Sequence, residues 1–254
     1  VEKQRPGAAL LDDMFQNPEI RANYVQNMFS EIAPKYDLVN RVMTFGLDIR
    51  WRNLVATAAV GTGADLIIDT GTGSGDLALE CSKMGAKNVF GLDFAQPMLI
   101  NARSKSQKND VANVDFAAAD GTRLPLPDSV ADAWTGAFVL RNIPKLDVAL
   151  QEAHRVLKPG GRLITLDAAR LQPSTLVQKI AAPGARFHFN KLVPLIGKIL
   201  SGHEDAYSYL PVSADNFFSP SEFSAQLRIN GFTVIRVFEF VFGTVMMHIA
   251  IKEQ

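Results

Sequence analysis

Along most of the chain, apolar residues occur in two patterns: short continuous runs, and positions spaced like one face of a helix. Short apolar runs such as Leu66–Ile68 have the length and composition of buried parallel strands. The stretch from Leu77 to Met84 has the apolar pattern of a helix that packs against a sheet. From Ala64 onward the two kinds of segment alternate regularly. The pattern therefore predicts an α/β fold with a mostly parallel sheet.

The same pattern gives approximate bounds for the elements. The expected strands cover residues 66–68, 88–93, 114–120, 131–138, 162–166, 232–240 and 245–252. Helices are expected over residues 24–33, 77–84, 96–108, 147–157 and 221–230, with further helices over 176–201. Lys158-Pro159-Gly160-Gly161 is interpreted as a turn that ends one helix and starts the fifth strand. The last two strands, joined at Gly243, are expected to close one edge of the sheet in antiparallel fashion.

The N-terminal part of the chain is less regular. Residues 1–60 are interpreted as a helical lid or lead-in and residues 61–254 as the main domain of a single globular unit. Within the first part, Tyr36–Arg52 mixes aromatic, acidic and basic residues without a clean period. Two interpretations remain open for this run: an amphipathic helical cap, or a lid over the glycine-rich turn described next.

A glycine-rich turn, Asp69-Thr70-Gly71-Thr72-Gly73-Ser74-Gly75-Asp76, lies between the first strand and the next helix. Glycine has no Cβ, so such a turn brings the backbone close to a ligand. A phosphate-binding loop would need Lys and Ser or Thr after Gly75, where Asp76 and Leu77 stand. A dinucleotide site would have its third glycine at Asp76, an anion where pyrophosphate charge would arrive. Carboxylates at both ends of the turn suit a ligand with an ammonium and a sulfonium group. The turn resembles the first motif of the S-adenosylmethionine-dependent methyltransferases.

Acidic residues stand at the ends of three successive strands, namely Asp69, Asp93 and Asp120. Ligands of open α/β sheets bind at this carboxyl edge. Asp93 lies about 20 residues beyond the glycine turn, the spacing expected of a carboxylate that accepts both ribose hydroxyls. Asp120 is a candidate acceptor for the adenine amino group. Together the three residues indicate an adenosyl ligand.

Composition narrows the class of protein further. Lys plus Arg equals Asp plus Glu, at 26 each, which argues against a broad basic face for nucleic acid. Cys81 is the single cysteine, so an internal disulfide or a thiolate cluster is excluded. The histidines have no metal-ligand spacing, which predicts no metal, and His154 and His248 are interpreted as structural. The chain has no apolar stretch of the ~20 residues that span a bilayer. We therefore expect a cytoplasmic protein.

Longer motifs appear in order around the glycine turn, and together they resemble the ubiquinone/menaquinone biosynthesis C-methyltransferase family. The resemblance covers nearly the whole chain from about Tyr24. It implies a Rossmann-like class I methyltransferase fold, with a mostly parallel seven-stranded sheet, an antiparallel last strand and helical lid segments. It also implies S-adenosyl-L-methionine as cofactor and transfer of its methyl group to a ring carbon of a polyprenylated benzoquinol or naphthoquinol. The motifs are Tyr36–Asn40, Thr44–Gly46 with Arg50–Arg52, Leu140–Asn142, Arg155–Gly161 and Ala206–Ser213.

The resemblance and the strand-end pattern together give candidate site residues. The cofactor-binding candidates are Asp69, Gly71, Thr72, Gly73, Gly75, Asp93, Phe94, Met98, Asp120 and Gly121. The catalytic candidates are Arg141, Asn142 and Tyr36, and the substrate-binding candidates are Asp48, Asp167 and Tyr207. Arg141, with Asn142, is expected to hold a developing phenolate and to orient a water that takes the proton. The alternative for Arg141 is a structural ion pair with Asp167 or Asp120.

The chain departs from the family near the expected substrate pocket, which leaves the acceptor open while the cofactor motifs are kept. The family usually has a histidine at Asp48 and an acidic-Phe-Ser run at Asp167-Ala168-Ala169. Two other functions therefore stay open: a methyltransferase on another lipophilic acceptor (a phospholipid amine, a sterol or a phenol) and a non-catalytic binding module. Phenylalanines such as Phe187, Phe189 and Phe217-Phe218 are candidates for a channel that holds a prenyl tail. A peripheral membrane contact, at the inner membrane face, and a homodimer also stay open.

Overall fold

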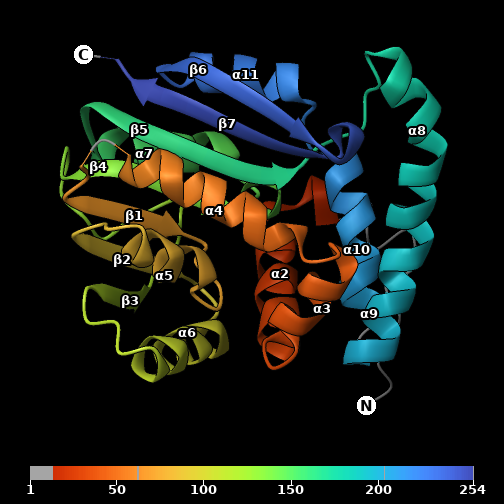
Figure 1. The fold of residues 1–254 in the computed structure, drawn as a ribbon, viewed down its shortest axis with the longest axis horizontal. Helices are drawn as coiled ribbons and strands as arrows, with labels where there is room; N and C mark the ends of the chain where they lie inside the picture. Colours follow the sequence, from red (N-terminus) through yellow and green to blue (C-terminus); the bar gives the residue numbers. More distant parts are fainter. Residues whose placement is uncertain (1–13, 62, 203, 254) are drawn as a thin grey trace.

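A single seven-stranded sheet forms the centre of the molecule (Figure 1). The computed structural model describes residues 14–61, 63–202 and 204–253, without the side chains of residues 204 and 205. The strand order is β3-β2-β1-β4-β5-β7-β6, and β7 is antiparallel to both of its neighbours. This confirms the predicted sheet. The strands are β1 Leu66–Thr70, β2 Asn88–Asp93, β3 Val114–Ala118, β4 Ala131–Ala137, β5 Leu157–Ala168, β6 Phe232–Phe240 and β7 Val245–Lys252.

Helices cover both faces of the sheet and one of its edges (Figure 1). Two of them begin with capping boxes, at Thr175 and at Ser219, in which side chains satisfy backbone N–H groups at the helix start. The helices are α2 Pro18–Ile32, α3 Tyr36–Met43, α4 Leu47–Val60, α5 Asp76–Lys83, α6 Gln96–Lys108, α7 Leu146–Val156, α8 Leu176–Phe187, α9 Val193–Ser201, α10 Glu204–Asp215 and α11 Pro220–Ile229. Short helical turns are η1 Leu140–Asn142, the π-helical η2 His188–Leu192 and η3 Val241–Gly243.

The sheet packs against helices on both faces because successive side chains of a strand point in opposite directions. Ile68 of β1 belongs to a buried cluster with residues of α7 and α11, including Leu150 and Phe223. Its neighbour Ile67 belongs to a second cluster with residues of α4 and α5, including Val55 and Ala78. Cys81 is fully buried in this second cluster, as expected of a small apolar residue.

A third buried cluster joins segments that are far apart in the sequence. It contains Val25 and Met28 of α2 and Val39 of α3, packed with Val193 of α9 and Tyr207 of α10. These helices stand together beside the sheet (Figure 1). α4, by contrast, lies on the sheet in the second cluster, whereas α2 and α3 belong to the helical layer beside the sheet.

Several boundaries differ from the sequence-based expectations. Tyr36–Arg52 forms α3 and the start of α4, an arrangement that both interpretations of this run allow. The first expected helix begins earlier, at Pro18, because the Asn17 side chain accepts hydrogen bonds from Glu19 N at 3.1 Å and Ile20 N at 3.3 Å. The rest of the expected lead-in, residues 1–13, lies outside the described residues.

The prediction of a turn at residues 158–161 was wrong. These residues belong to β5, which pairs with β4 from Leu157 onward. The register shifts between Ala131, opposite Leu157, and Ala133, opposite Arg162. The extra residues therefore form an irregularity within the strand, and Gly160, at φ +74°, takes the left-handed conformation there.

Candidate active site

The glycine turn brings the backbone close to its neighbours at one position and leaves open space at another. A Cβ on Gly71, which has φ +65°, would lie 2.1 Å from Val139 Cγ2, so a side chain there would collide with the segment after β4. A Cβ on Gly73 would have Tyr36 Cε1, at 4.0 Å, as its nearest neighbour. The turn therefore presents open space beside Gly73, in front of Tyr36.

Asp93, at the end of β2, is held against this turn. Its two carboxylate oxygens accept hydrogen bonds from Gly73 N and Ala95 N, each at 2.8 Å. Burial raises the pKa of the Asp93 carboxyl, and the backbone hydrogen bonds oppose that rise. Asp93 also lines a small cavity of ≈ 30 Å³, together with the predicted residues Gly71, Gly73, Phe94, Met98, Tyr36 and Asn142.

Asp69 is buried behind the turn. Its carboxylate accepts hydrogen bonds from Thr72 Oγ1 at 2.6 Å and Thr135 Oγ1 at 2.8 Å. Burial raises the pKa of Asp69 to about 6, and the two hydroxyl groups partly oppose this effect. Asp69 and Thr72 line neither of the two cavities of the site. These contacts give Asp69 a role in fixing the shape of the turn.

The remaining predicted cofactor residues lie around the same edge but outside the small cavity. Asp120 is exposed two residues beyond β3, where its Oδ1 accepts a hydrogen bond from Thr122 N at 2.8 Å. Gly121 lies against β1, since a Cβ there would be 3.1 Å from Thr70 Cγ2. Gly75, at φ +83°, caps the N-terminus of α5.

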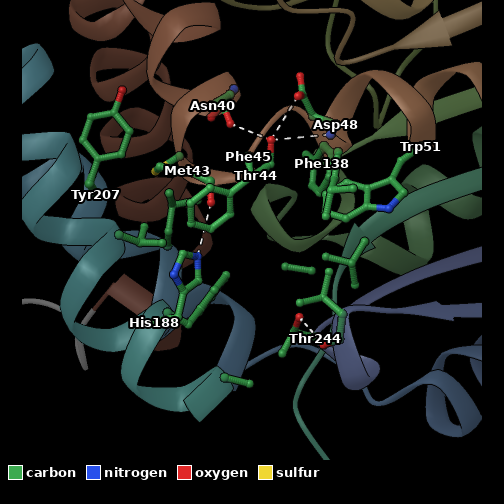
Figure 2. A pocket seen from close by; sticks show the side chains of 18 of the residues that line it. Asn40, Met43, Thr44, Phe45, Asp48, Trp51, Phe138, His188, Tyr207 and Thr244 are labelled. Atoms are coloured by element: carbon green, nitrogen blue, oxygen red, sulfur yellow. Dashed lines mark hydrogen bonds between the residues drawn. The ribbon is translucent and has the colours of Figure 1, made fainter. Parts of the chain in front are cut away.

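A second, much larger cavity of ≈ 470 Å³ lies between the helical layer and the sheet. It has the volume of a typical ligand pocket, about 300–1,000 Å³, and most of its lining is apolar. Phe29, Tyr36 and Phe138 line both cavities, so the two spaces adjoin. The side chains labelled in Figure 2 line this larger cavity, and they come from α3, α4, η2 and α10 as well as from the sheet edge.

Asp48 is a polar group in the wall of this larger cavity. Its side chain is almost fully buried and accepts hydrogen bonds from Thr44 Oγ1 at 3.0 Å and Arg52 Nη1 at 2.5 Å (Figure 2 shows the Thr44 bond). Arg52 Nη1 also lies 3.7 Å from Asp76 Oδ2 at the end of the glycine turn. The desolvation of Arg52 on burial opposes protonation, but Asp76 and Asp48 raise its pKa overall. Charged groups therefore connect the larger cavity with the glycine turn.

Arg141 and Asp167 form a buried ion pair. The pair joins Arg141 Nη1 to Asp167 Oδ1, and the backbone N of Arg141 donates to Asp167 Oδ2 at 3.2 Å. Of the two acids considered as structural partners of Arg141, Asp167 is the one that forms the ion pair. Arg141 nevertheless lines the larger cavity, and its Nε has no hydrogen-bond partner among the described residues. Asp167 itself lies behind Arg141 and lines neither cavity.

Three further predicted residues lie at or near these spaces. Asn142 donates from Nδ2 to Phe138 O at 3.2 Å, and its Oδ1 has no partner among the described residues. Burial raises the pKa of both Tyr36 and Tyr207, and for Tyr36 the nearby Arg52 guanidinium opposes the rise. Tyr207 lines the larger cavity from α10 (Figure 2).

The helix α2 is bonded to the η1 turn and to Phe94, which lines the smaller cavity. Arg21 Nη2 donates to the backbone oxygen of Arg141, and Gln26 Nε2 donates to Phe94 O at 3.1 Å. Phe29, on the same helix, lines both cavities. α2 thus spans the space between η1 and the end of β2.

Other residues of the larger cavity escaped the sequence analysis. His188 is bonded through Nε2 to Met43 O at 3.2 Å, and its ring lies 5.6 Å from that of Phe45 (Figure 2). The contact between Met43 and His188 joins residues that are far apart in the sequence. The sequence analysis predicted helices over residues 176–201 but did not predict this contact. Among the phenylalanines considered for a channel, Phe189 lines the cavity, Phe187 is exposed, and Phe217 and Phe218 pack in the core of the sheet.

The two histidines interpreted as structural are packed against other elements. His248 is fully buried, with Nε2 at 3.0 Å from both Ser224 Oγ and Pro220 O. The His154 ring packs edge-on against Phe232. Within the described residues, no group of three or more His, Cys, Asp or Glu side chains is arranged to hold a metal ion. No helix in the same part of the chain is both long and apolar enough to cross a membrane.

Several solved structures share the fold of this chain. A [4+2]-cyclase, SpnF, matches 90% of the chain and 95% of its own length, with a TM-score of 0.67 and 17% identity. A methyltransferase from Thermotoga maritima, described as dependent on S-adenosylmethionine, matches 89% of the chain and 99% of its own length, with a TM-score of 0.59 and 19% identity. At these identities the likeness establishes the fold alone.

Proteins found by sequence comparison are more similar to the chain than these structures are. A demethylmenaquinone methyltransferase from Thermus thermophilus is 40% identical over 87% of the chain and 98% of its own length. A ubiquinone/menaquinone biosynthesis C-methyltransferase, UbiE, from Desulfotalea psychrophila is 34% identical over 90% of each protein. The model of the ubiE/COQ5 methyltransferase family matches residues 17–252. The chain therefore belongs to the ubiE/COQ5 methyltransferase family, whose members use S-adenosylmethionine as the methyl donor.

Proposed function

We propose that the chain methylates a ring carbon of a prenylated quinol, and that a demethylated naphthoquinol is its acceptor. The observation that carries this proposal is the apolar cavity of ≈ 470 Å³, which shares Phe29, Tyr36 and Phe138 with the cavity at the glycine turn. A ring bound between these residues would have its tail among apolar side chains and its reacting edge toward the cofactor. The name of the relative from Thermus thermophilus supports the choice of a naphthoquinol.

The residues around the smaller cavity fit S-adenosylmethionine. Asp93 offers a carboxylate at the end of β2, where a ribose would lie, and Gly73 leaves open space beside it. The Oδ1 atom of Asn142 is buried without a partner among the described residues and can accept a hydrogen bond from an ammonium group. When bound, the cofactor supplies an electrophilic methyl group on a sulfonium.

Arg141 is the group best suited to bind the acceptor oxygen. A ring carbon becomes nucleophilic when the neighbouring hydroxyl loses its proton, so the site must stabilise a phenolate. Asp167 binds the guanidinium through Nη1, while Nε has no partner among the described residues and the side chain lines the larger cavity. The ion pair therefore fixes the guanidinium, and its remaining N–H groups can donate to the phenolate oxygen.

The same cavity contains an acceptor for the proton of the hydroxyl. Among the described residues that line it, Asp48 carries the only carboxylate. In the proposal, a water held by Arg141 and Asn142 takes the phenol proton and passes it toward Asp48. The ring carbon would then bond to the methyl carbon as the bond between sulfur and that methyl breaks, with S-adenosylhomocysteine as the leaving group. The hydrogen on the methylated ring carbon would leave as a proton to water, which restores the aromatic ring.

Incubation with a demethylated menaquinol and methyl-labelled cofactor tests the proposal. We expect the label in a product whose fragmentation assigns the new methyl group to the ring carbon. A parallel incubation with phosphatidylethanolamine and with a simple phenol tests the other lipophilic acceptors. Label in either of these, and none in the quinol, would contradict the proposed acceptor. Binding of the cofactor without any labelled product would instead favour a non-catalytic binding module.

A further inference from the structure

The outer side of α8 carries an apolar stripe that no described residue covers. Leu176 and Ile180 each have 73% of their surface exposed, and Phe187 has 59%. Their spacing of four and seven residues aligns them along one side of the helix. Another side of the helix, with Ala181, Ala185 and others, lines the larger cavity. α8 therefore separates the cavity from a solvent-exposed apolar surface.

The stripe continues onto neighbouring elements. On α9, Leu195 is 51% exposed and Ile199 is 71% exposed, four residues apart. Phe45 and Phe242, which line the cavity, are also exposed, at 77% and 49%. α8 packs beside η3, which contains Phe242, and Figure 1 shows α8 and α9 along the edge of the molecule opposite β3. Phe45 and Phe242 are exposed and stand in the cavity wall, so they mark its mouth, and Phe242 lies on an element that packs beside α8.

Positive charge accompanies this surface. Residues 168–203 contain five Lys and Arg and neither Asp nor Glu, although the whole chain has a formal net charge of zero. The basic residues on α8, η2 and α9 are Lys179, Arg186, Lys191 and Lys198, and their side chains are exposed. We call these four residues, together with Leu176, Ile180, Phe187, Leu195 and Ile199, the docking face. Exposed apolar side chains beside basic ones are typical of a surface that binds anionic membranes.

We propose that the docking face lies on an anionic lipid bilayer, so that the mouth of the larger cavity opens toward the lipid. This inference rests on the proposed function in one respect: a prenylated quinol resides in a bilayer and would enter the cavity from there. The charge of the face favours a lipid surface over a second copy of the chain. A symmetric dimer through this face would bring its basic residues on the two copies together, which is destabilising.

Co-sedimentation with vesicles tests the proposal without cofactor or quinol, so its outcome is independent of the methyl transfer reaction. The probes are vesicles of phosphatidylcholine alone and vesicles that also contain phosphatidylglycerol. We expect binding to the anionic vesicles, weakened by added salt. We expect I180S/F187S and K179E/R186E each to weaken this binding by about tenfold or more. None of these four residues lines either cavity, so cofactor binding should stay unchanged in both variants.

Matched changes elsewhere serve as controls. I229S/I235S removes two exposed apolar residues from α11 and β6, and K108E/K145E reverses two exposed charges near α6 and α7. Both should bind vesicles like the unchanged chain. Equal binding by all four variants, or no binding to anionic vesicles, would overturn the proposal. So would a chain that sediments as a dimer in buffer and becomes a monomer in I180S/F187S, since the face would then be a subunit interface.

Discussion

The two cavities of the site are built in opposite ways. The smaller one is formed mainly by a glycine turn and strand ends, where hydrogen bonds fix the carboxylate of Asp93 in the wall and that of Asp69 behind the turn. The larger one is lined by helices from the first and last thirds of the chain, and its walls are mostly apolar side chains. The contrast indicates that the cofactor side depends on polar contacts within one sheet edge. The acceptor side depends on packing between distant segments.

The largest expected effect is at Arg141, which stands between the two regions. Arg141→Ala would leave the Asp167 carboxylate buried without its partner, since that side chain is only 2% exposed. We expect the free energy of unfolding to fall by about 3–5 kcal/mol. Denaturant unfolding monitored by circular dichroism measures this change.

A double variant separates stability from chemistry at the same position. R141M/D167L removes both charges, and we expect it to recover much of the lost stability, because a buried pair often exchanges for apolar residues at little cost. Its methyl transfer should stay lost if the guanidinium binds the phenolate. A stable and fully active double variant would restrict Arg141 to a structural role.

The next effect concerns the cofactor side alone. Asp93→Ala removes the acceptor for Gly73 N and Ala95 N and the carboxylate at the small cavity. We expect the affinity for S-adenosylhomocysteine to fall on the order of a hundredfold, the effect of losing one or two hydrogen bonds to a charged group. Calorimetric titration measures this affinity. Asp115→Ala, at an exposed position of β3, is the matched control and should bind normally.

A pH dependence is expected from Asp69, because burial raises its pKa to about 6 in the folded chain. The unfolded pKa of Asp is about 3.9, so between these values the folded state binds more protons and stability falls as pH rises. Asp69→Asn removes this ionisation. Relative to the unchanged chain, we expect the variant to gain about 2 kcal/mol between pH 4 and pH 7. Thermal unfolding at the two pH values measures the gain, and a constant difference would contradict the assignment.

The smallest expected effect is confined to the acceptor side. Ala185→Phe adds a ring to the wall of the larger cavity without touching the glycine turn. We expect kcat/KM for a prenylated quinol to fall about tenfold, which corresponds to about 1.4 kcal/mol, while the affinity for the cofactor product is unchanged. Ala112→Phe, at an exposed turn, provides the control for added bulk. A loss of cofactor affinity in Ala185→Phe would show that the two cavities are coupled.

The sheet and the cofactor side were predictable because their determinants are local. Apolar runs of strand length and the glycine turn predicted β2, β6 and β7 with the bounds that the structure has. The residues after β1 and β2 lie together because the carboxyl ends of parallel strands meet at one edge. Gly73 and Asp93, 20 positions apart, are hydrogen-bonded to each other for this reason.

The acceptor side was predictable only in outline, because its contacts join distant residues. His188 is bonded to Met43 O across 145 positions, and no periodicity in either segment indicates that contact. The partner of Arg141 was left open between two acids, and only the fold brings Asp167 to it. The irregular start of β5 was missed because Pro and Gly in a short run are typical of a turn as well as of a bulge.

The position of α2 has a consequence for the order of events in turnover. Arg21 and Gln26 tie this helix to η1 and to the end of β2, while the space beneath it is only ≈ 30 Å³. Ligand pockets are about ten times that size, so we expect α2 to move away, with loss of both bonds, before a nucleoside enters or leaves. Since Phe29 of the same helix also lines the larger cavity, that cavity is complete only when α2 is seated. We therefore expect a compulsory sequence, with the donor arriving first and its spent form departing last, visible as product-inhibition patterns in steady-state kinetics.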